Sequence, residues 1–194
     1  MPTGVHLPNA RELLFNAAEQ VLLRNGVSGL TSRAVTAEAG VAKGVVHRHF
    51  VDFDAFLAEL VLDRVAQLDG PMTALREAAG AGSVATNLVE ALTVVFSPLA
   101  VAVPALVITR DSLRARLREV GAARFPLIAE GAVAITAYLA AEQELGRVAG
   151  SADVPTLSHT LVGAAHLLYT DRGSVPPGSD ALQKLVVGIL HGAT

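Results

Sequence analysis

The sequence contains no cysteine, and this absence narrows the chemistry that the chain can perform. Without thiols there is no disulfide framework and no thiolate site. The motifs of common enzyme classes are missing too: there is no Gly-x-Ser-x-Gly elbow, no phosphate-binding loop and no clustered pair of acids. Gly80-Ala81-Gly82 is too short a glycine match for a dinucleotide site. We therefore expect a protein that is not an enzyme and that needs no cofactor.

The alternation of apolar and polar residues that marks β-strands is also absent, and apolar residues recur mostly at helical spacing. A chain of 194 residues with 52% hydrophobic content can bury a substantial core. The sequence therefore predicts an all-α fold. Nothing near the beginning resembles a signal peptide, so we expect a cytoplasmic protein.

Periodicity, caps and stop signals place the expected helices along the chain. Asn9 and Glu12 form a possible capping box for the first helix, and Asp69-Gly70-Pro71 is expected to stop the fourth. The expected helices cover residues 10–25, two short segments within 31–50, 52–68, 83–97, 126–145, 154–169 and 179–190, with a loop at 171–178.

One apolar run raises the question of a membrane. Residues 92–109 carry no charge over eighteen positions, which reaches the lower limit for a transmembrane helix. Pro98 and Pro104 interrupt the run, and Arg110 and Asp111 end it. We therefore favour two buried helices around a proline break, with no membrane as a partner.

Residues 31–50 are the most informative stretch of the chain. Thr31 is a good N-cap for a short helix, and Gly40 can take the left-handed conformation that ends it. A second helix is expected over residues 42–49, with its amino end suited to a phosphate. Two short helices joined by a glycine turn are the outline of a helix-turn-helix that reads DNA.

Polar and cationic side chains crowd the second of these helices. Lys43, His47, Arg48 and His49 lie within seven residues and can donate hydrogen bonds to phosphates or base edges. The charge distribution agrees with this interpretation, because residues 1–50 carry five basic and three acidic residues, a net +2. The remaining 144 residues carry ten basic and fifteen acidic ones, a net −5. A weakly basic segment on an acidic one suits DNA binding that is sensitive to salt.

This stretch resembles the N-terminal domain of the TetR family of bacterial transcriptional regulators, over roughly the first 60 residues. The residues that carry the resemblance are Ala17, Ala18, Gly26, Thr31, Ala39, Gly40, Val41, Gly44, His49 and Phe50. The rest of the chain fits that family only in length and helical character. Four positions depart from the family pattern: Thr36 replaces Ala, Val45 replaces Thr or Ser, His47 replaces Tyr, and Phe53 replaces a Lys that contacts phosphate.

The resemblance implies a domain organisation and a set of contacts. It predicts a three-helix helix-turn-helix domain over residues 1–50 and a larger helical effector-binding and dimerisation domain over 51–194. It also implies a homodimer that binds a palindromic operator in double-stranded DNA, most simply as a repressor. The DNA-binding residues expected on this basis are Thr31, Ser32, Arg33, Lys43, His47 and His49.

The last two expected helices suggest how the copies pair. In TetR-like proteins the final two helices join their counterparts in a four-helix bundle, and two recognition helices together read a near-palindrome. Apolar residues recur there at helical spacing beside small Gly163, Ala164 and Gly188. The alternative is that both helices pack only within their own chain. The expected interface residues are Leu157, Leu161, Ala165, Leu168, Leu182, Leu185, Val186 and Ile189.

The family also implies an effector cavity among the middle helices. These helices are so apolar that the effector is expected to be a small hydrophobic or weakly polar molecule, whose binding favours a head spacing that no longer fits the operator. The polar and aromatic candidates for its site are Asn87, Thr93, Phe96, Thr109, Thr136, Tyr138 and His166.

Several signals have a plainer interpretation. His47 and His49 point to different faces of a helix, and His159 and His166 have no nearby carboxylate, so no metal site is expected. Arginines at 110, 114 and 118 form a basic stripe, which could bind an anion or transmit domain motion, but a solvated face balanced by Asp111 and Glu119 is simpler. The rival function is a helical ligand carrier or interaction protein that has lost operator binding. The departures at Val45 and Phe53 are compatible with such a loss.

Overall fold

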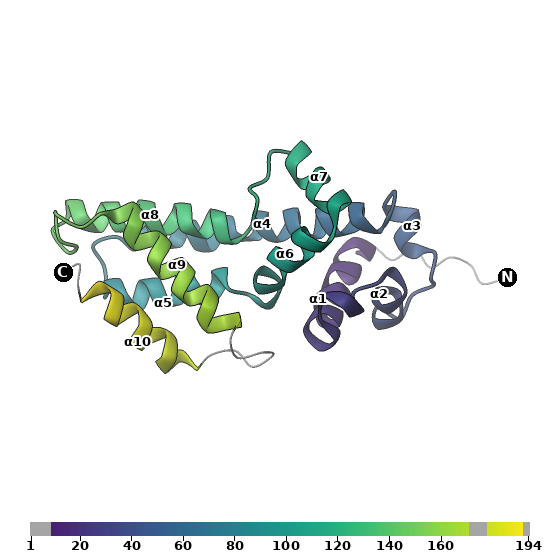
Figure 1. The fold of residues 1–194 in the computed structure, drawn as a ribbon, viewed down its shortest axis with the longest axis horizontal. Helices are drawn as coiled ribbons and strands as arrows, with labels where there is room; N and C mark the ends of the chain where they lie inside the picture. Colours follow the sequence, from purple (N-terminus) through teal and green to yellow (C-terminus); the bar gives the residue numbers. More distant parts are fainter. Residues whose placement is uncertain (1–8, 171–177, 192–194) are drawn as a thin grey trace.

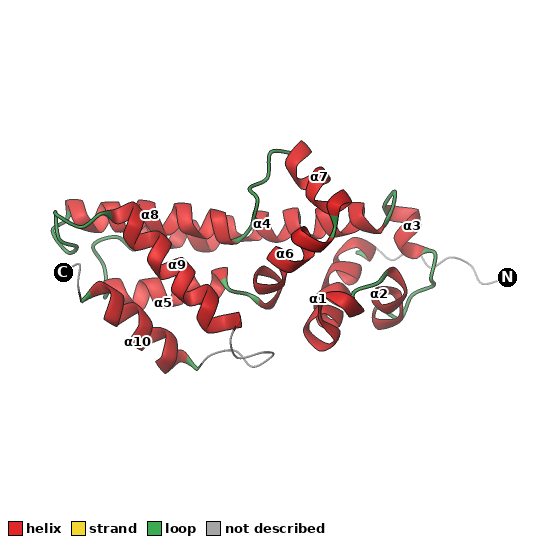
Figure 2. Cartoon of the chain, viewed as in Figure 1, coloured by secondary structure: helices red, strands yellow, loops and turns green. Residues whose placement is uncertain are grey.

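The structure is a computed structural model that describes residues 9–170 and 178–191. Every regular element in these ranges is an α-helix, as the spacing of apolar residues predicted (Figure 2). The helices are α1 (Ala10–Gly29), α2 (Ser32–Glu38), α3 (Val45–His49), α4 (Phe53–Glu77), α5 (Val84–Val95), α6 (Pro98–Thr109), α7 (Asp111–Glu119), α8 (Ile128–Glu144), α9 (Val154–Thr170) and α10 (Ser179–Leu190).

The molecule is elongated, with α1–α3 at one end and α5, α8, α9 and α10 at the other (Figure 1). We call α1–α3 the head and α5–α10 the body. Helix α4 leaves the head and runs along the body beside α8, so it belongs to both (Figure 1). Helix α6 packs against α1, and α7 packs against α4. The head is therefore held to the body through α4, α6 and α7.

An aromatic cluster forms the core of the head and joins it to α4. The rings of Phe50 and Phe56 meet edge to face at 5.0 Å, and Phe15 lies 5.6 Å from Phe56. All three are almost fully buried. Helix α1 extends beyond its expected end at residue 25 and bends at Gly26, whose φ of +66° suits glycine. The expected capping box is wrong, because the Asn9 side chain makes no cap hydrogen bond.

Helix α4 does not stop at Pro71, so the expected end near residue 68 is wrong. It continues through Pro71 to Glu77, although proline removes one helical hydrogen bond. Met72 and Leu75 in this last part are 4% and 5% exposed, and α4 lies against both α5 and α8. Burial of these side chains offsets the lost hydrogen bond. Its start is as predicted, because the Asp52 carboxylate accepts from the Ala55 N–H at 2.7 Å.

The uncharged run at 92–109 forms two helices, as expected. Helix α5 ends at Val95 and α6 begins at Pro98, and the two axes are bent by 52°. Ser97 caps α6 by accepting from the Ala100 N–H at 3.4 Å. Within the described ranges no single helix has the length and apolar content to cross a membrane, although this bent pair meets both criteria when its helices are taken together.

The remaining helices of the body follow the predicted spacing, with one addition. Helix α8 begins at Ile128 rather than at residue 126, because Leu127 has a φ of +72° and its N–H donates to Glu130 at 2.6 Å. Helices α9 and α10 lie where they were expected. Before α9, the Asp153 carboxylate accepts from the Thr156 hydroxyl at 2.6 Å and from the Thr156 N–H at 3.3 Å. These two hydrogen bonds lower the pKa of the Asp153 carboxyl. The expected loop at 171–178 falls, except for Gly178, outside the described residues, and α7 was not predicted.

One close approach in the body gives a test of the packing. A Cβ added to Gly131 would lie 2.6 Å from Cγ2 of Val95, so α8 approaches α5 too closely for any side chain. We expect Gly131→Ala to lower the free energy of unfolding by about 1–3 kcal/mol, since the core must open to admit the methyl group. Thermal denaturation followed by circular dichroism measures this change.

The matched control is Gly70→Ala in α4, where an added Cβ meets nothing within 4 Å apart from its chain neighbours. Alanine there is expected to change stability by less than about 1 kcal/mol, because the advantage of alanine over glycine in a helix is opposed by the contact of the new Cβ with the Pro71 ring. Equal effects of the two substitutions would contradict the close contact between α5 and α8.

Candidate nucleic-acid interface and ligand cavity

The two short helices of the head form as their caps predict. The Thr31 hydroxyl accepts from the Ala34 N–H at 3.1 Å, and Gly40 has a φ of +65°. Helix α3 begins at Val45, later than the expected start at residue 42, because Ala42 to Gly44 form a turn closed by the Val45 N–H to the Ala42 carbonyl at 3.0 Å. Lys43 therefore lies on the turn before α3.

Burial fixes which face of α3 meets solvent. Val45 and Val46 are 9% and 0% exposed and pack into the head, followed by Phe50 at 4%. The opposite face is exposed and carries the basic and polar residues of the segment. Valine at position 45, a departure from the pattern, therefore contributes to the core of the head. The exposed residues are Lys43, His47, Arg48 and His49.

The basic residues of the head that have no ion-pair partner in the described chain lie on α2, α3 and the turn between them. Arg11 pairs with Glu59, and Arg24 pairs with Glu38. The other three basic residues of the first fifty are exposed and have no carboxylate partner among the described residues. These three are Arg33, Lys43 and Arg48. The uncompensated positive charge of the head is therefore confined to α2, α3 and the turn between them, where it can meet phosphates.

The sequence-predicted DNA contacts lie together on this unit. Five of the six predicted residues are exposed, and Ser32 is half-buried. The exposed ones are Thr31, Arg33, Lys43, His47 and His49. Thr36, another departure, is 1% exposed and donates its hydroxyl to the carbonyls of Ser32 and Arg33 at 3.0 and 3.1 Å. Its buried hydroxyl is thus satisfied within α2. No group of three potential metal ligands lies in the described ranges.

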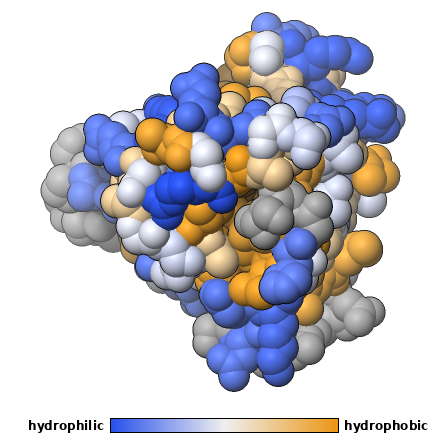
Figure 3. All heavy atoms as spheres, turned by 90° about the vertical axis from the view of Figure 1, so that its left-hand side faces the viewer, coloured by the Kyte–Doolittle hydropathy of each residue, from blue (hydrophilic) through white to orange (hydrophobic). Residues whose placement is uncertain are grey.

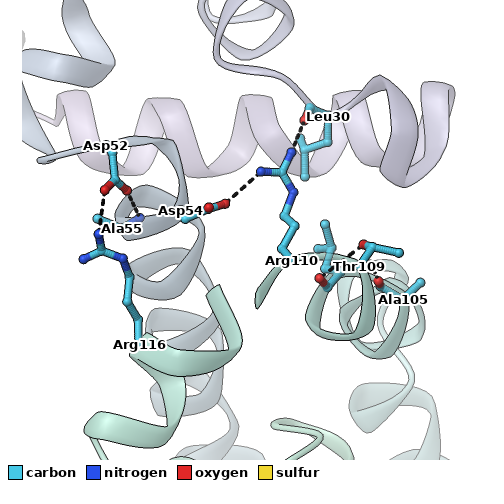
Figure 4. A network of polar contacts seen from close by, with 9 residues as sticks. Leu30, Asp52, Asp54, Ala55, Ala105, Thr109, Arg110 and Arg116 are labelled. Carbon is cyan, nitrogen blue, oxygen red and sulfur yellow. Dashed lines mark hydrogen bonds and ion pairs between the residues drawn. The ribbon is translucent and has the colours of Figure 1, made fainter. Parts of the chain in front are cut away.

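Arg110, at the junction of α6 and α7, ties the head to α4 (Figure 4). Its Nη1 donates to the Asp54 carboxylate at 2.7 Å, and its Nη2 donates to the Leu30 carbonyl at 3.4 Å. Leu30 follows α1 directly, so one guanidinium joins three segments. Its carbon also lies 5.4 Å from the centre of the Phe53 ring, a cation–π contact.

This contact gives a physical reason for the phenylalanine at position 53. The Phe53 ring stacks on Phe56 at 5.5 Å with an interplanar angle of 21°, and Arg110 covers it. A lysine there would bring a second positive charge close to the guanidinium. The phenylalanine that departs from the family pattern is therefore accompanied by Arg110, which packs on its ring.

The basic stripe at 110, 114 and 118 is not a solvated face throughout, because Arg110 binds Asp54 and the Leu30 carbonyl. The simpler interpretation is therefore wrong in part, and Arg116 beside the stripe is also engaged. Arg116 donates to the Asp52 carboxylate at 2.5 Å, next to the bond that this carboxylate accepts from Ala55 (Figure 4). Only Arg114 pairs within its own helix, with Asp111 at 2.6 Å. The sequence missed the partners of Arg110 and Arg116, because Asp52 and Asp54 lie more than fifty residues away.

A second set of bonds holds α1 to α4. Arg64 donates to Glu19 at 2.7 Å and to the Asn16 side chain at 2.9 Å. Burial lowers the pKa of Arg64, but its hydrogen bond to Glu19 and the charges of Glu19 and Asp63 outweigh this and raise the pKa. The first helix of the head is thus fixed to α4 as well as to α6.

A cavity of about 520 Å³ lies where the head meets the body. Of the seven expected ligand residues, Thr93 and Phe96 line it, and His166 lies behind Phe96 with ring centres 6.0 Å apart. The structure brings these three together at the ends of α5 and α9. Arg24 of the head and Tyr169 of α9 also line the cavity, and neither was predicted, because sequence periodicity does not show which helix ends meet.

Two other expected ligand residues lie in a separate polar network in the body. The Asn87 amide donates to the Tyr138 hydroxyl at 2.9 Å. Glu142 is fully buried, accepts from the Gly80 N–H at 3.3 Å and pairs with Arg147 at 3.3 Å. Burial, assisted by the hydrogen bond to Glu142, raises the pKa of Tyr138 to about 12. These side chains therefore have partners within the chain and are not turned toward the 520 Å³ cavity.

The last two expected ligand residues use their hydroxyls within their own helices. Thr109 donates to the Ala105 carbonyl at 2.7 Å, at the end of α6 beside Arg110 (Figure 4). Thr136 donates to the Ala132 carbonyl at 2.8 Å. Neither residue lines the cavity at the head. The seven residues are therefore divided among separate places, and three of them are near one cavity.

Most of the expected interface residues lie in the core of their own chain. Within the chain α10 packs on α5 and α9 packs on α8, whereas pairing of these helices with a second copy stays a prediction. The face of a helix with the most regular apolar repeat is the face that packs within its own chain. Leu157, Leu161, Ala165, Leu182 and Val186 are at most 9% exposed, whereas Leu168, Leu185 and Ile189 are half-buried.

Comparisons with known proteins relate this geometry to a family. The model of bacterial regulatory proteins of the tetR family matches residues 14–60. Curated protein sequences gave no match. The matched segment covers α1–α3 and the start of α4, which contains the exposed cationic surface.

Solved structures share the fold over almost the whole chain. A transcriptional regulator from Rhodococcus sp. Rha1 has a TM-score of 0.69 and 23% identity, covering 94% of this chain and 97% of its own. A putative TetR-family transcriptional regulator from Mesorhizobium loti has a TM-score of 0.68 and 15% identity, covering 95% of each chain. The regulator FadR from Bacillus subtilis, in complex with stearoyl-CoA, has a TM-score of 0.65 and 15% identity, covering 93% and 98%.

The raised pKa of Tyr138 predicts a loss of stability at high pH. The unfolded chain ionises this hydroxyl near pH 10, whereas the folded chain does so near pH 12. Its contribution is therefore complete below pH 10 and is lost as the pH rises through 12, by about 3 kcal/mol in total. Urea denaturation between pH 9 and 12 should show a steeper loss for the natural chain than for Tyr138→Phe. Parallel pH profiles would contradict it.

The Arg110 contacts predict a large effect of one arginine and a small effect of its neighbour. Arg110→Ala removes two hydrogen bonds of a charged group, and we expect it to lower the free energy of unfolding by about 1–3 kcal/mol. Arg114→Ala removes a bond between more exposed groups and should cost less than about 0.5 kcal/mol. Urea denaturation measures both, and equal costs would refute the special position of Arg110.

Proposed function

We infer the function of this chain from its place in the tetR family of bacterial regulatory proteins, whose DNA-binding domain it carries and whose fold it shares. We propose that it binds an operator in double-stranded DNA and regulates transcription. The observation that carries the proposal is the gathering of the three unpaired cations of the head on the exposed side of α2, α3 and their turn. Everywhere else in the described head, arginine is held by a carboxylate.

The contacts proposed with DNA follow from exposure and chemistry. Lys43, Arg48 and Arg33 bind phosphates, since each is an exposed cation without a partner. His47 and His49 present flat rings with polar nitrogens on the same short helix and can reach base edges in the major groove. Thr31 and Ser32 lie at the start of α2 and bind the backbone beside them.

A helix of five residues reads few bases, so we propose that the protein works as a homodimer on a palindromic operator. The proposed interface includes the half-buried Leu168, Leu185 and Ile189 of the original expectation. It also includes the outer face of α9 and α10, where Leu167 and Val187 are 68% and 39% exposed. Gly163 and Gly188 lie on these helices with open space around them.

The surface of the body is consistent with such an association. Viewed from the end away from the head, it shows apolar groups among polar ones and an apolar recess near the centre (Figure 3). Association with a molecule that covers exposed apolar area of this kind is favourable. A second copy would cover the apolar side chains of α9 and α10 and fix the distance between the two heads.

We further propose that the protein is a repressor, released when a small hydrophobic molecule binds near α6. Helix α6 packs on α1 and ends at Arg110, whose guanidinium holds the Leu30 carbonyl of the head and the first turn of α4. A ligand that moves α6 therefore changes the bonds that orient the head. Such a ligand shifts the population of head spacings only if it binds the two spacings unequally.

Removal of the free cations tests the operator proposal. We expect Lys43→Ala and Arg48→Ala to weaken binding to all DNA sequences and to reduce the slope of log affinity against log salt by about one per copy. Arg76→Ala is the matched control, because Arg76 lies on the body part of α4 and donates to Thr73. Fluorescence anisotropy on DNA that the protein selects from a random pool, at several salt concentrations, measures both quantities.

The same experiment decides between the proposal and its rival. Failure to select any sequence, together with no dependence on salt, would reject operator binding. An apolar molecule that copurifies with a protein unable to bind DNA would instead favour a helical ligand carrier.

A further inference from the structure

The 520 Å³ cavity lies between the head and the body, so it differs from a site enclosed by the body alone. Its volume falls within the range of roughly 300–1,000 Å³ that holds small organic molecules. The other three cavities described have volumes of about 220, 310 and 390 Å³. The walls come from α1, the end of α5, the start of α6 and the end of α9: Leu22, Leu23, Arg24, Gly26, Thr93, Phe96, Ser97, Pro98, Val101, Ala102 and Tyr169.

Tyr169, stacked on Phe96, gives this cavity an aromatic wall. The two rings have centres 5.3 Å apart and an interplanar angle of 23°. Phe96 is only 2% exposed, and its ring centre also lies 6.0 Å from that of His166, so it backs Tyr169 and offers the cavity little surface of its own. Tyr169 is half-buried, so part of its ring remains accessible. A planar ring placed against Tyr169 gains both buried area and favourable ring contacts.

Few polar groups of the walls remain available to a ligand. The Thr93 hydroxyl donates to the Val89 carbonyl at 2.7 Å. Ser97 uses its oxygen to accept from Ala100, which leaves its O–H free to donate. The Tyr169 hydroxyl has no partner among the described residues. The cavity thus offers two hydroxyl donors beside an otherwise apolar surface.

The charges at the cavity argue against an anionic ligand. Arg24 is the only cation in the walls, and Glu38 of α2 already neutralises it. An anion would have to displace Glu38 from an exposed pair and would gain one ion pair for the one it breaks. Burial of apolar area must therefore supply the affinity, and an added negative charge would cost desolvation without a compensating partner.

We propose that this cavity binds an uncharged, planar aromatic molecule, which packs against the accessible ring of Tyr169 and lies between α1 and α6. Its effect on DNA rests on the proposed function. Because Leu22, Leu23 and Gly26 belong to α1, the ligand touches the head directly. Leu30, just beyond α1, is the residue whose carbonyl Arg110 holds, so separation of α1 from α6 acts on this bond. The bound state therefore favours a different head position from the free state.

Two fluorescent probes with the same ring system test the chemistry. N-phenyl-1-naphthylamine is uncharged, and 8-anilino-1-naphthalenesulfonate differs from it by one sulfonate. We expect the uncharged probe to bind with one saturable site per chain and at least ten times more tightly than the sulfonate. Equal or tighter binding of the sulfonate, or no saturable binding of the uncharged probe, would overturn the proposal.

Substitutions locate the probe. Ala102→Phe places a ring in the cavity and should weaken binding of the uncharged probe at least tenfold, whereas Ala123→Phe fills the separate 390 Å³ cavity and should leave it unchanged. Tyr169→Leu keeps apolar volume but removes one ring of the stack, and it should weaken binding several-fold even if Ala102→Phe does not fold. Equal affinities for Tyr169→Leu and the natural chain would exclude this site.

A last measurement separates this inference from the proposed function. Saturating N-phenyl-1-naphthylamine should weaken binding to the selected DNA at least tenfold in the natural chain and not in Ala102→Phe. Probe binding that Ala102→Phe abolishes, in a protein that selects no DNA, would reject the operator and keep the ligand site. DNA binding that the bound probe leaves unchanged would refute the link between this cavity and the head.

Discussion

The start of α4 is the point on which the arrangement of the molecule depends. Its first turn presents the carboxylates of Asp52 and Asp54, which the arginines of α6 and α7 bind from the body side. On the other side Phe56 packs into the aromatic core of the head. Carboxylates at the amino end of a helix are also favoured by the helix dipole. The same turn therefore holds the head, begins the longest helix and receives the body.

Two groups of basic residues have different surroundings. Arginines at 11, 24, 64, 110 and 116 are engaged by carboxylates and hold helices together. The exposed cations of α2, α3 and the turn between them have no carboxylate partner among the described residues. This division explains how a chain with a net charge of −3 can have a locally positive surface. A few cations are enough to make a surface positive when no carboxylate of the protein pairs with them.

Local signals predicted much of the fold, and long-range ones were missing. Caps at Thr31 and Asp52, the turn at Gly40 and the limits of α9 and α10 follow from neighbouring residues, and each is found in the structure. Pro71 misled because packing of Met72 and Leu75 outweighs a local stop signal. The Arg110 contacts and the cavity at Phe96 join residues far apart in sequence, which periodicity in one helix cannot pair. Apolar repeats in α9 and α10 predicted which side chains are buried, and the described chain itself buries most of them.

The contact between Phe53 and Arg110 bears on how far each part of the molecule tolerates exchange. The ring at 53 opens α4, and the guanidinium that covers it lies between α6 and α7. Transplanting α1–α3 with the start of α4 onto a foreign helical body would separate this pair and leave the ring exposed. Exchange of single side chains on the outer surface of α3 leaves the pair intact. The exposed side of α3 can therefore vary residue by residue at little structural cost, whereas exchange of an entire module disturbs the joint between head and body.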